Sequence, residues 1–150
     1  MGLVIDSVDF KLLKMLSKDA NTSLFKMGRD VGLSTTGVRR RIKKLEKDGL
    51  IKNYSAIIDP RKYGYMITAF IKVNADSRAL HEITRSLARR HEVCELYRIT
   101  GDYDLMIKVR AKDIDSLNKF VEDYILSLDS IKSIRTTVTM DTIKETMLNL

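Results

Sequence analysis

The sequence is poor in the features that mark disulfide-stabilised, secreted or membrane-spanning proteins. Its 150 residues include a single cysteine, Cys94, so no disulfide can form within the chain. The longest uninterrupted apolar run is only a few residues, far below the roughly 20 that a helix needs to cross a bilayer. The first ten residues, MGLVIDSVDF, lack a basic segment followed by an apolar one, so no secretory signal is expected. A cytoplasmic chain is therefore the expectation.

The arrangements that build catalytic and metal sites are also missing. The two histidines, His81 and His91, have no cysteine or acidic partner at metal-ligand spacing. Cys94 stands in a predicted strand without a histidine-based arrangement, which favours a packed thiol over a reactive one. No nucleophile–base pair, metal cluster or phosphate-binding loop is recognisable. The sequence therefore predicts neither an enzyme nor a cofactor or metal.

Positive charge, by contrast, is abundant and concentrated towards one end. The formal net charge is +7. Residues 1–60 hold 12 Lys and Arg against 7 Asp and Glu, whereas residues 61–150 hold 15 against 13. Within residues 34–47, STTGVRRRIKKLEK, there are six basic residues and one acid. Such a cluster suits a polyanion such as DNA, and the alternative is a basic helix face that only keeps the chain solvated.

The first third of the chain predicts three short helices. They run from Asp6 to a break at residues 19–21, from Ser23 to Val31, and from Ser34 to Asp48. Asp6 and Asp9 have the spacing of a capping box at the start of the first helix. Gly32 is expected to end the second helix in a left-handed conformation, two residues before Ser34 caps the third. The tight connection between the last two helices predicts a helix-turn-helix.

The third helix has one apolar and one basic face. Val38, Ile42 and Leu45 form the stripe expected to pack inward. The residues expected to bind DNA are Ser34, Thr35, Thr36, Arg39 and Arg40 at the base-reading end and Arg41, Lys43, Lys44 and Lys47 nearer the phosphates. Short hydroxyl side chains permit close approach, and arginines one turn later can reach base edges. Arg41 lies beside the apolar stripe rather than opposite it.

After the third helix, residues 50–58 read as an extended segment that ends at Pro60 and a turn over residues 61–64. This segment suits the wing of a winged helix, a linker, or a strand that pairs with a second subunit.

The remaining ninety residues predict a strand-helix-strand-strand-helix-strand order, the ferredoxin-like βαββαβ arrangement. The expected elements are a strand at 66–75, a helix from Asp76 to about His91, strands at 93–100 and 104–111, a helix capped by Asp113, and a strand at 131–140. Both helices must cover one face of the sheet. The other face, which carries Phe70 and Met106, is therefore expected to mediate a homodimer.

The hairpin between the second and third strands carries an unusual tip. Residues 98–110, RITGDYDLMIKVR, meet at Gly101-Asp102-Tyr103-Asp104, and Gly and Asp are ordinary turn residues. Two carboxylates around a tyrosine, in a chain that is otherwise basic, suggest a small binding site. The alternative is a solvated hairpin tip in which Asp104 satisfies backbone N–H groups.

At these spacings the chain resembles the leucine-responsive regulator (Lrp)/AsnC family of prokaryotic transcription regulators, also called feast/famine regulatory proteins. The resemblance rests on Asp6-x-x-Asp9, GLSTTGVRRRIKKLEKDGLI (32–51), IIDPRKYGY (57–65) and ITGDYDLMIKV (99–109). It implies an α+β chain with a winged helix-turn-helix DNA-binding domain and strand linker at 1–60. A ferredoxin-like (RAM-like) domain for effector binding and oligomerisation would occupy 61–150.

The resemblance also implies a function and partners. The family regulates amino-acid metabolism through transcription, so double-stranded DNA is an expected partner. Its members dimerise through their sheets and often assemble octamers of four dimers. Two recognition helices in a dimer favour a palindromic site. An amino-acid effector would bind between dimers at Gly101, Asp102, Tyr103 and Asp104, with Thr136 as a hydroxyl contact. Carboxylates can hold its ammonium and backbone N–H groups its carboxylate. The alternative is an architectural DNA-compacting protein without a small-molecule effector.

Overall fold

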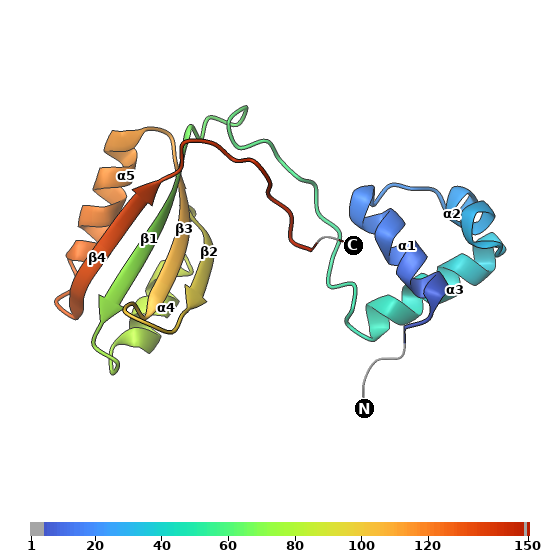
Figure 1. Ribbon diagram of the computed structural model, residues 1–150, viewed down its shortest axis with the longest axis horizontal. Helices are drawn as coiled ribbons and strands as arrows, with labels where there is room; N and C mark the ends of the chain where they lie inside the picture. The colour runs from blue at the N-terminus through green and yellow to red at the C-terminus, as the bar shows by residue number, and fades with distance from the viewer. Residues whose placement is uncertain (1–4, 149) are drawn as a thin grey trace. The chain divides into compact units, whose positions relative to one another are not determined.

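The computed structural model describes residues 5–148 and residue 150. The chain divides into two compact units (Figure 1). Each unit has its own hydrophobic core. The first unit extends to Ile57 and includes a short C-terminal segment from Thr146, and the second is Ile58–Glu145. The expectation that no secretory signal is present concerns residues 1–10, and residues 1–4 lie outside the described residues.

Three helices form the first unit, as predicted. They are α1 (Ser7–Lys18), α2 (Leu24–Val31) and α3 (Thr35–Lys47). The Asp6 carboxylate accepts hydrogen bonds from the backbone nitrogens of Val8 (2.9 Å) and Asp9 (2.8 Å), and the Asp9 carboxylate accepts one from the Asp6 nitrogen. The predicted capping box is therefore confirmed, and it satisfies backbone donors that the first turn of a helix leaves free.

The turn between α2 and α3 is tight because two glycines permit it. Gly32 ends α2 in a left-handed conformation (φ 72°), as predicted. The Leu33 N–H then donates to the Gly28 carbonyl oxygen (2.9 Å). A Cβ on Gly28 would lie 2.4 Å from the Leu33 carbonyl oxygen, so this close approach depends on glycine. The turn fixes the direction in which α3 leaves α2.

The core of this unit is small. Its buried side chains come from all three helices and are Leu12, Met27, Val38, Ile42 and Leu45. The last three are the apolar stripe predicted for α3, which is confirmed. Because this stripe faces the core, the opposite face of α3 points to solvent.

Residues 50–66 contain no strand in the structure. Ile57 and Ile58, which lie in the predicted extended segment, are 98% and 64% exposed. The turn predicted after Pro60 is confirmed, since the Tyr65 N–H donates to the Pro60 carbonyl oxygen (2.8 Å). In the single chain this segment is an extended linker, and its pairing with a second chain stays a prediction.

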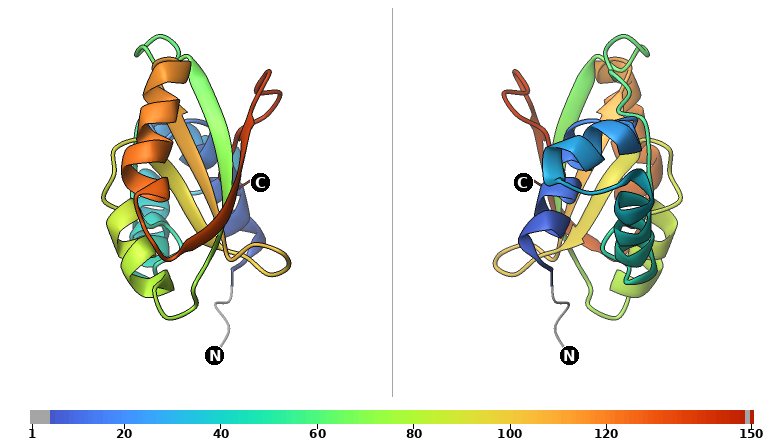
Figure 2. Two further views of the ribbon diagram at one scale, coloured as in Figure 1. Left: turned by 90° about the vertical axis from the view of Figure 1, so that its left-hand side faces the viewer. Right: turned by 90° about the vertical axis from the view of Figure 1, so that its right-hand side faces the viewer.

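The second unit has the predicted order of strands and helices. Its elements are β1 (Ile67–Ala75), α4 (Leu80–Leu87), β2 (Val93–Arg98), β3 (Leu105–Ala111), α5 (Ile114–Val121), the π-helical turn η1 (Glu122–Leu126) and β4 (Ile131–Val138). The strands form one antiparallel sheet in the order β2-β3-β1-β4. Figure 2 shows α4 and α5 on the same side of this sheet. The ferredoxin-like fold is therefore confirmed.

Alternation along the two central strands builds the second core. The paired and buried residues are Ala69, Ile71 and Val73 of β1 with Val109, Ile107 and Leu105 of β3. Burial of each larger aliphatic side chain stabilises the fold by about 1.5–3 kcal/mol. Because side chains alternate along a strand, the intervening residues point to the face that the helices leave free.

The helix-free face carries a charge cluster near Phe70. Lys108 is only 8% exposed, and its ammonium contacts the carboxylates of Glu95 (3.0 Å) and Glu145. The same Glu145 carboxylate binds the Arg110 guanidinium through both oxygens (2.9 and 2.7 Å). Hydrogen bonding to Lys108 lowers the pKa of both carboxyl groups below their usual range. This face is therefore a mixed surface of apolar side chains and paired charges.

The helix predicted from Asp76 to about His91 is wrong at both ends. In the structure α4 covers only Leu80–Leu87. The Asp76 carboxylate accepts a hydrogen bond from the Arg78 nitrogen (2.9 Å) and pairs with the Arg78 guanidinium (3.1 Å). Residues 77–79 form a turn as a result. Asp76 closes this turn instead of capping a helix, a competition that is typical of aspartate.

Candidate functional site

The N-terminal end of α3 presents hydroxyl groups to solvent. The Ser34 side-chain oxygen accepts a hydrogen bond from the Gly37 N–H (3.1 Å), so the predicted N-cap is confirmed. A hydroxyl that accepts from the backbone still has its proton to donate outward. Thr35 and Thr36 follow and are exposed. This end also carries the positive end of the helix dipole, which favours a phosphate nearby.

Exposed cations continue along α3. They are Arg39, Arg40, Lys43, Lys44 and Lys47. Within residues 5–148 and 150, none of these five side chains forms an ion pair. Five positive charges on one helix without an internal counter-ion attract a polyanion, and binding would release the counter-ions of that polyanion. The outer surface of α3 is therefore the candidate DNA-binding surface (Figure 1).

Arg41, which the sequence predicts to bind DNA, instead forms ion pairs within the chain. Its guanidinium lies 2.6 Å from the Asp6 carboxylate and 2.8 Å from the Asp9 carboxylate at the start of α1. These hydrogen bonds raise the pKa of Arg41 above its usual value. The pKa of Asp6 is lowered, mainly by the hydrogen bond from the Asp9 backbone N–H and secondly by the hydrogen bond from the Arg41 side chain. The sequence held one signal of this pairing, because Arg41 falls beside the apolar stripe.

The predicted effector loop between β2 and β3 is anchored on the end of β1. The Asp104 N–H donates to the Val73 carbonyl oxygen (2.9 Å), and the Asp104 carboxylate accepts from the Ala75 N–H (2.9 Å). The Asn74 side-chain amide donates to the Asp102 carbonyl oxygen (3.0 Å). Asp104 therefore holds the loop in place, and this carboxylate is already occupied by a backbone donor.

The tip of the loop is open to solvent. Gly101 has a φ of 107°, which favours glycine, and both Gly101 and Asp102 are exposed. In the part of the chain that the structure describes, the Asp102 carboxylate has neither a hydrogen bond nor an ion pair. Tyr103 is half-buried, and the Lys72 ammonium lies 6.0 Å from its ring centre. The loop thus offers one free carboxylate to a ligand.

Thr136 lies apart from this loop within one chain. It is exposed on β4, where it pairs with Ile71 of β1 and therefore faces the helix-covered side of the sheet. Lys72, which neighbours Tyr103, faces the opposite side. In addition, β1 separates β4 from β3, whose start carries the loop. One chain therefore does not bring Thr136 and the loop together.

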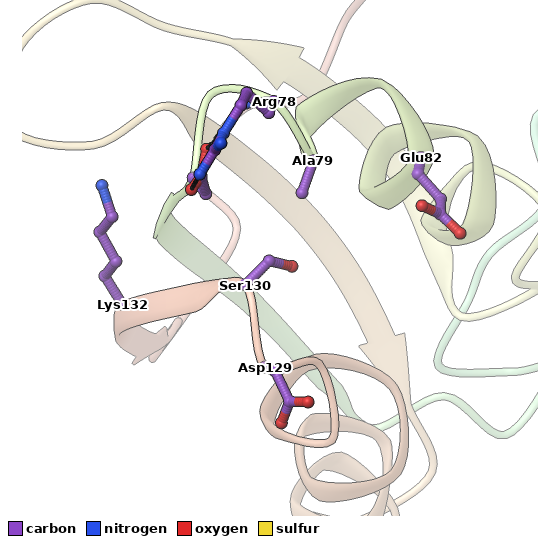
Figure 3. A pocket seen from close by; sticks show the side chains of 7 residues that line it. Arg78, Ala79, Glu82, Asp129, Ser130 and Lys132 are labelled. Atoms are coloured by element: carbon purple, nitrogen blue, oxygen red, sulfur yellow. Dashed lines mark hydrogen bonds and ion pairs between the residues drawn. The ribbon is translucent and has the colours of Figure 1, made fainter.

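A separate surface hollow of about 520 Å³ lies where β1 leads into α4 and η1 leads into β4 (Figure 3). The residues that line it carry both signs of charge and are Asp76, Arg78, Ala79, Glu82, Asp129, Ser130 and Lys132. The Asp76 N–H donates to the Ser130 carbonyl oxygen (2.9 Å), which joins the two sides. This hollow contains none of the predicted site residues.

Cys94 is exposed, so the expectation of a packed thiol is wrong. The reason is an irregularity in β2, whose pairing with β3 shifts between Val93 and Glu95. Partial burial nevertheless raises the pKa of the thiol, which disfavours the reactive thiolate. Residues 5–148 and 150 contain no group of three or more His, Cys, Asp or Glu side chains placed to hold a metal ion. Their helices are also too short or too polar to cross a membrane.

The fold and the cationic surface of α3 define a helix-turn-helix DNA-binding protein with a second, ferredoxin-like domain. Residues 5–52 match the family model described as winged helix-turn-helix DNA-binding, and residues 68–148 match the Lrp/AsnC ligand binding domain. The chain therefore belongs to the Lrp/AsnC family of transcriptional regulators.

Similar proteins cover nearly the whole chain. The HTH-type transcriptional regulator FL11 of Pyrococcus horikoshii is 36% identical over 146 residues, which are 97% of this chain and 96% of the relative. The crystal structure of transcriptional regulator NMB0573 of Neisseria meningitidis, in complex with L-Met, has a TM-score of 0.92 and 25% identity and covers 96% of this chain and 95% of its own. An AsnC family regulator from Agrobacterium tumefaciens has a TM-score of 0.91, 31% identity and 97% coverage of both chains.

Proposed function

We propose that the chain is a sequence-specific transcription regulator of amino-acid or related metabolism, and that a small amino-acid-like effector modulates it. The observation that carries the DNA-binding part is the row of exposed cations on α3, which lack internal ion pairs within the described residues. The relatives support this reading because they are named transcriptional regulators. We expect it to act in the cytoplasm, where such a regulator meets the chromosome.

We propose a homodimer as the DNA-binding form. The helix-free face of the sheet supports this, because it combines the half-buried Phe70 and Met106 with the paired charges around Lys108. A twofold dimer would present two α3 helices, which suits a palindromic site with half-sites in successive major grooves. Four such dimers in an octamer are the larger assembly that we expect from the family.

Binding to duplex DNA should weaken steeply as salt rises. If each protomer contacts about three phosphates, the slope of log K against log[salt] should be about −5. Fluorescence anisotropy of a labelled duplex, repeated over a series of KCl concentrations, measures this slope. A slope near zero would show that the cations of α3 do not bind phosphates. Footprinting then separates a regulator, which protects discrete sites, from an architectural protein, which coats DNA uniformly.

The effector part of the proposal rests on the free carboxylate of Asp102. An amino acid carries an ammonium that this carboxylate can hold and a carboxylate that backbone N–H groups can hold. The structure of NMB0573 with L-Met supports an amino acid as the ligand class. A site that also uses Thr136 requires a second chain, which is why we place the effector between dimers.

Two variants separate effector binding from loop anchoring. In a thermal-shift screen of the twenty amino acids, a true ligand should raise the melting temperature, because it stabilises the folded state. Asp102→Ala should lower the affinity for that ligand by about 10- to 100-fold, which is the typical contribution of a hydrogen bond to a charged group. It should leave the unliganded protein as stable as before. Asp104→Ala should instead lower the unliganded stability by about 1–3 kcal/mol, since the Ala75 N–H loses its acceptor. If Asp102→Ala responds to the ligand as the wild type does, the loop is not the site.

A further inference from the structure

Arg41 joins two helices of the DNA-binding unit at one point. Its Nη1 atom contacts Asp6 Oδ2 at 2.6 Å and Asp9 Oδ1 at 2.8 Å. Both acids belong to the capping box at the start of α1, whereas Arg41 lies in the middle of α3. The sequence separation between Arg41 and these acids is more than 30 residues, so the contact is a tertiary one.

Burial makes this contact specific. The Asp9 side chain is only 9% exposed, and a carboxylate that leaves water needs a cation and hydrogen bonds in exchange. The planar guanidinium of Arg41 supplies both, and its side chain is itself 30% exposed. Both hydrogen bonds come from the single Nη1 atom. A lysine could supply the charge, but its ammonium lies one bond nearer the backbone than an arginine Nη1 and so reaches less far towards the two carboxylates.

The position of Arg41 links this contact to recognition. Each residue of a helix is rotated by 100° from the one before it, so the angle between Arg41 and Arg40 is fixed. Arg40 lies on the outer stripe with Thr36. A contact that fixes Arg41 against α1 therefore also fixes the rotation of α3 about its own axis. A small rotation error would move the outer side chains out of hydrogen-bond reach of base edges.

We propose that Arg41 is a positioning residue for DNA recognition: it orients α3 through Asp6 and Asp9 and does not itself bind DNA. This inference rests on the proposed function and replaces the sequence-based assignment of Arg41 to the phosphates. To contact a phosphate, the Arg41 guanidinium would have to leave both carboxylates, and Asp9 would then be a largely buried acid without its cation.

The salt dependence of DNA binding tests this inference, because each phosphate contact adds about 0.9 to the slope. Lys43→Gln, the matched control, should make the slope shallower by about 2 for a dimer and should weaken specific and non-specific duplexes alike. Arg41→Gln should leave the slope unchanged and should reduce the ratio of specific to non-specific affinity by about tenfold or more. Arg41→Lys should recover less than half of the specificity lost in Arg41→Gln, measured as the logarithm of the affinity ratio, since charge alone is not sufficient to orient α3.

Asp9→Asn provides the second arm, since asparagine can still accept the capping hydrogen bond. A positioning role predicts that Asp9→Asn lowers specific affinity as Arg41→Gln does, and that the double variant loses little more. A phosphate-binding role predicts the reverse, because the released Arg41 would bind DNA at least as tightly. Circular dichroism and thermal unfolding of each variant show whether α3 is still folded.

The outcomes separate this inference from the proposed function. A shallower slope for Arg41→Gln, or unchanged specificity in Asp9→Asn, overturns the positioning role while DNA binding stands. A flat slope for the wild-type chain overturns both proposals, since no recognition would then remain for Arg41 to support.

Discussion

Replacing Leu12 by alanine is expected to abolish DNA binding while the ferredoxin-like unit stays folded. Leu12 is fully buried and lies in a core that has few other fully buried side chains, among them Met27 and Val38. Truncating a buried leucine costs about 2–5 kcal/mol through lost burial and the cavity left behind. A unit of this size rarely has more than a few kcal/mol of stability, so the loss is comparable to the whole.

Thermal unfolding and DNA binding, measured on the same variant, check this prediction. Leu12→Ala should lose the transition of the helical unit and keep that of the sheet-containing unit. Leu87→Ala is the matched control, because Leu87 is equally buried but lies on α4 in the other core. It should lower the stability of the second unit and leave the helical transition in place. A single transition that shifts as a whole in both variants would show that the two units unfold together.

Much of the helical unit could be predicted because its signals are local. The Asp6–Asp9 capping box, the Ser34 cap and the left-handed Gly32 each depend on residues within one turn of the chain, and each is present in the structure. The apolar stripe of α3 follows from helical geometry alone. Local chemistry was therefore sufficient to identify the helix-turn-helix.

What the sequence did not reveal is mostly tertiary. The pairing of Arg41 with two acids more than 30 residues away has no periodic pattern, so a charge in a basic run looked like a DNA contact. The same is true of the almost fully buried Lys108, which depends on Glu145 near the end of the chain. Side chains that bridge distant segments can only be assigned once the fold brings the segments together.

The candidate effector loop lies between these two cases. The hairpin and its glycine follow from turn chemistry, and the structure places Gly101 at a positive φ. From the sequence both acids are predicted to contact the effector, and backbone binding by Asp104 is only the alternative. In the structure they differ, since Asp104 accepts a hydrogen bond from the Ala75 N–H and Asp102 is exposed. The distinction depends on how β1 ends beside the loop.

The largest expected effect on recognition comes from replacing Arg39 and Arg40 together by alanine. Both side chains are exposed on α3 and follow the hydroxyl-rich start of the helix, where base edges would be nearest. An arginine that binds a guanine in two places contributes about 1–3 kcal/mol of discrimination. Two such contacts in each protomer are four in the dimer, so the loss of specific affinity should be about 1000-fold or more. Stability should hardly change, because neither side chain forms an ion pair in the described residues.

The matched control is the double variant Arg85→Ala and Arg89→Ala, which removes the same charge from exposed positions around the end of α4. Anisotropy titrations with a footprinted site and with a scrambled duplex measure specific and non-specific affinity side by side. If Arg39 and Arg40 read bases, their loss should weaken the footprinted site far more than the scrambled one. If they only neutralise phosphates, both duplexes should weaken equally and the salt slope should become shallower. Equal weakening in the control variant would mean that net charge alone, and not the position of these arginines on α3, accounts for the effect.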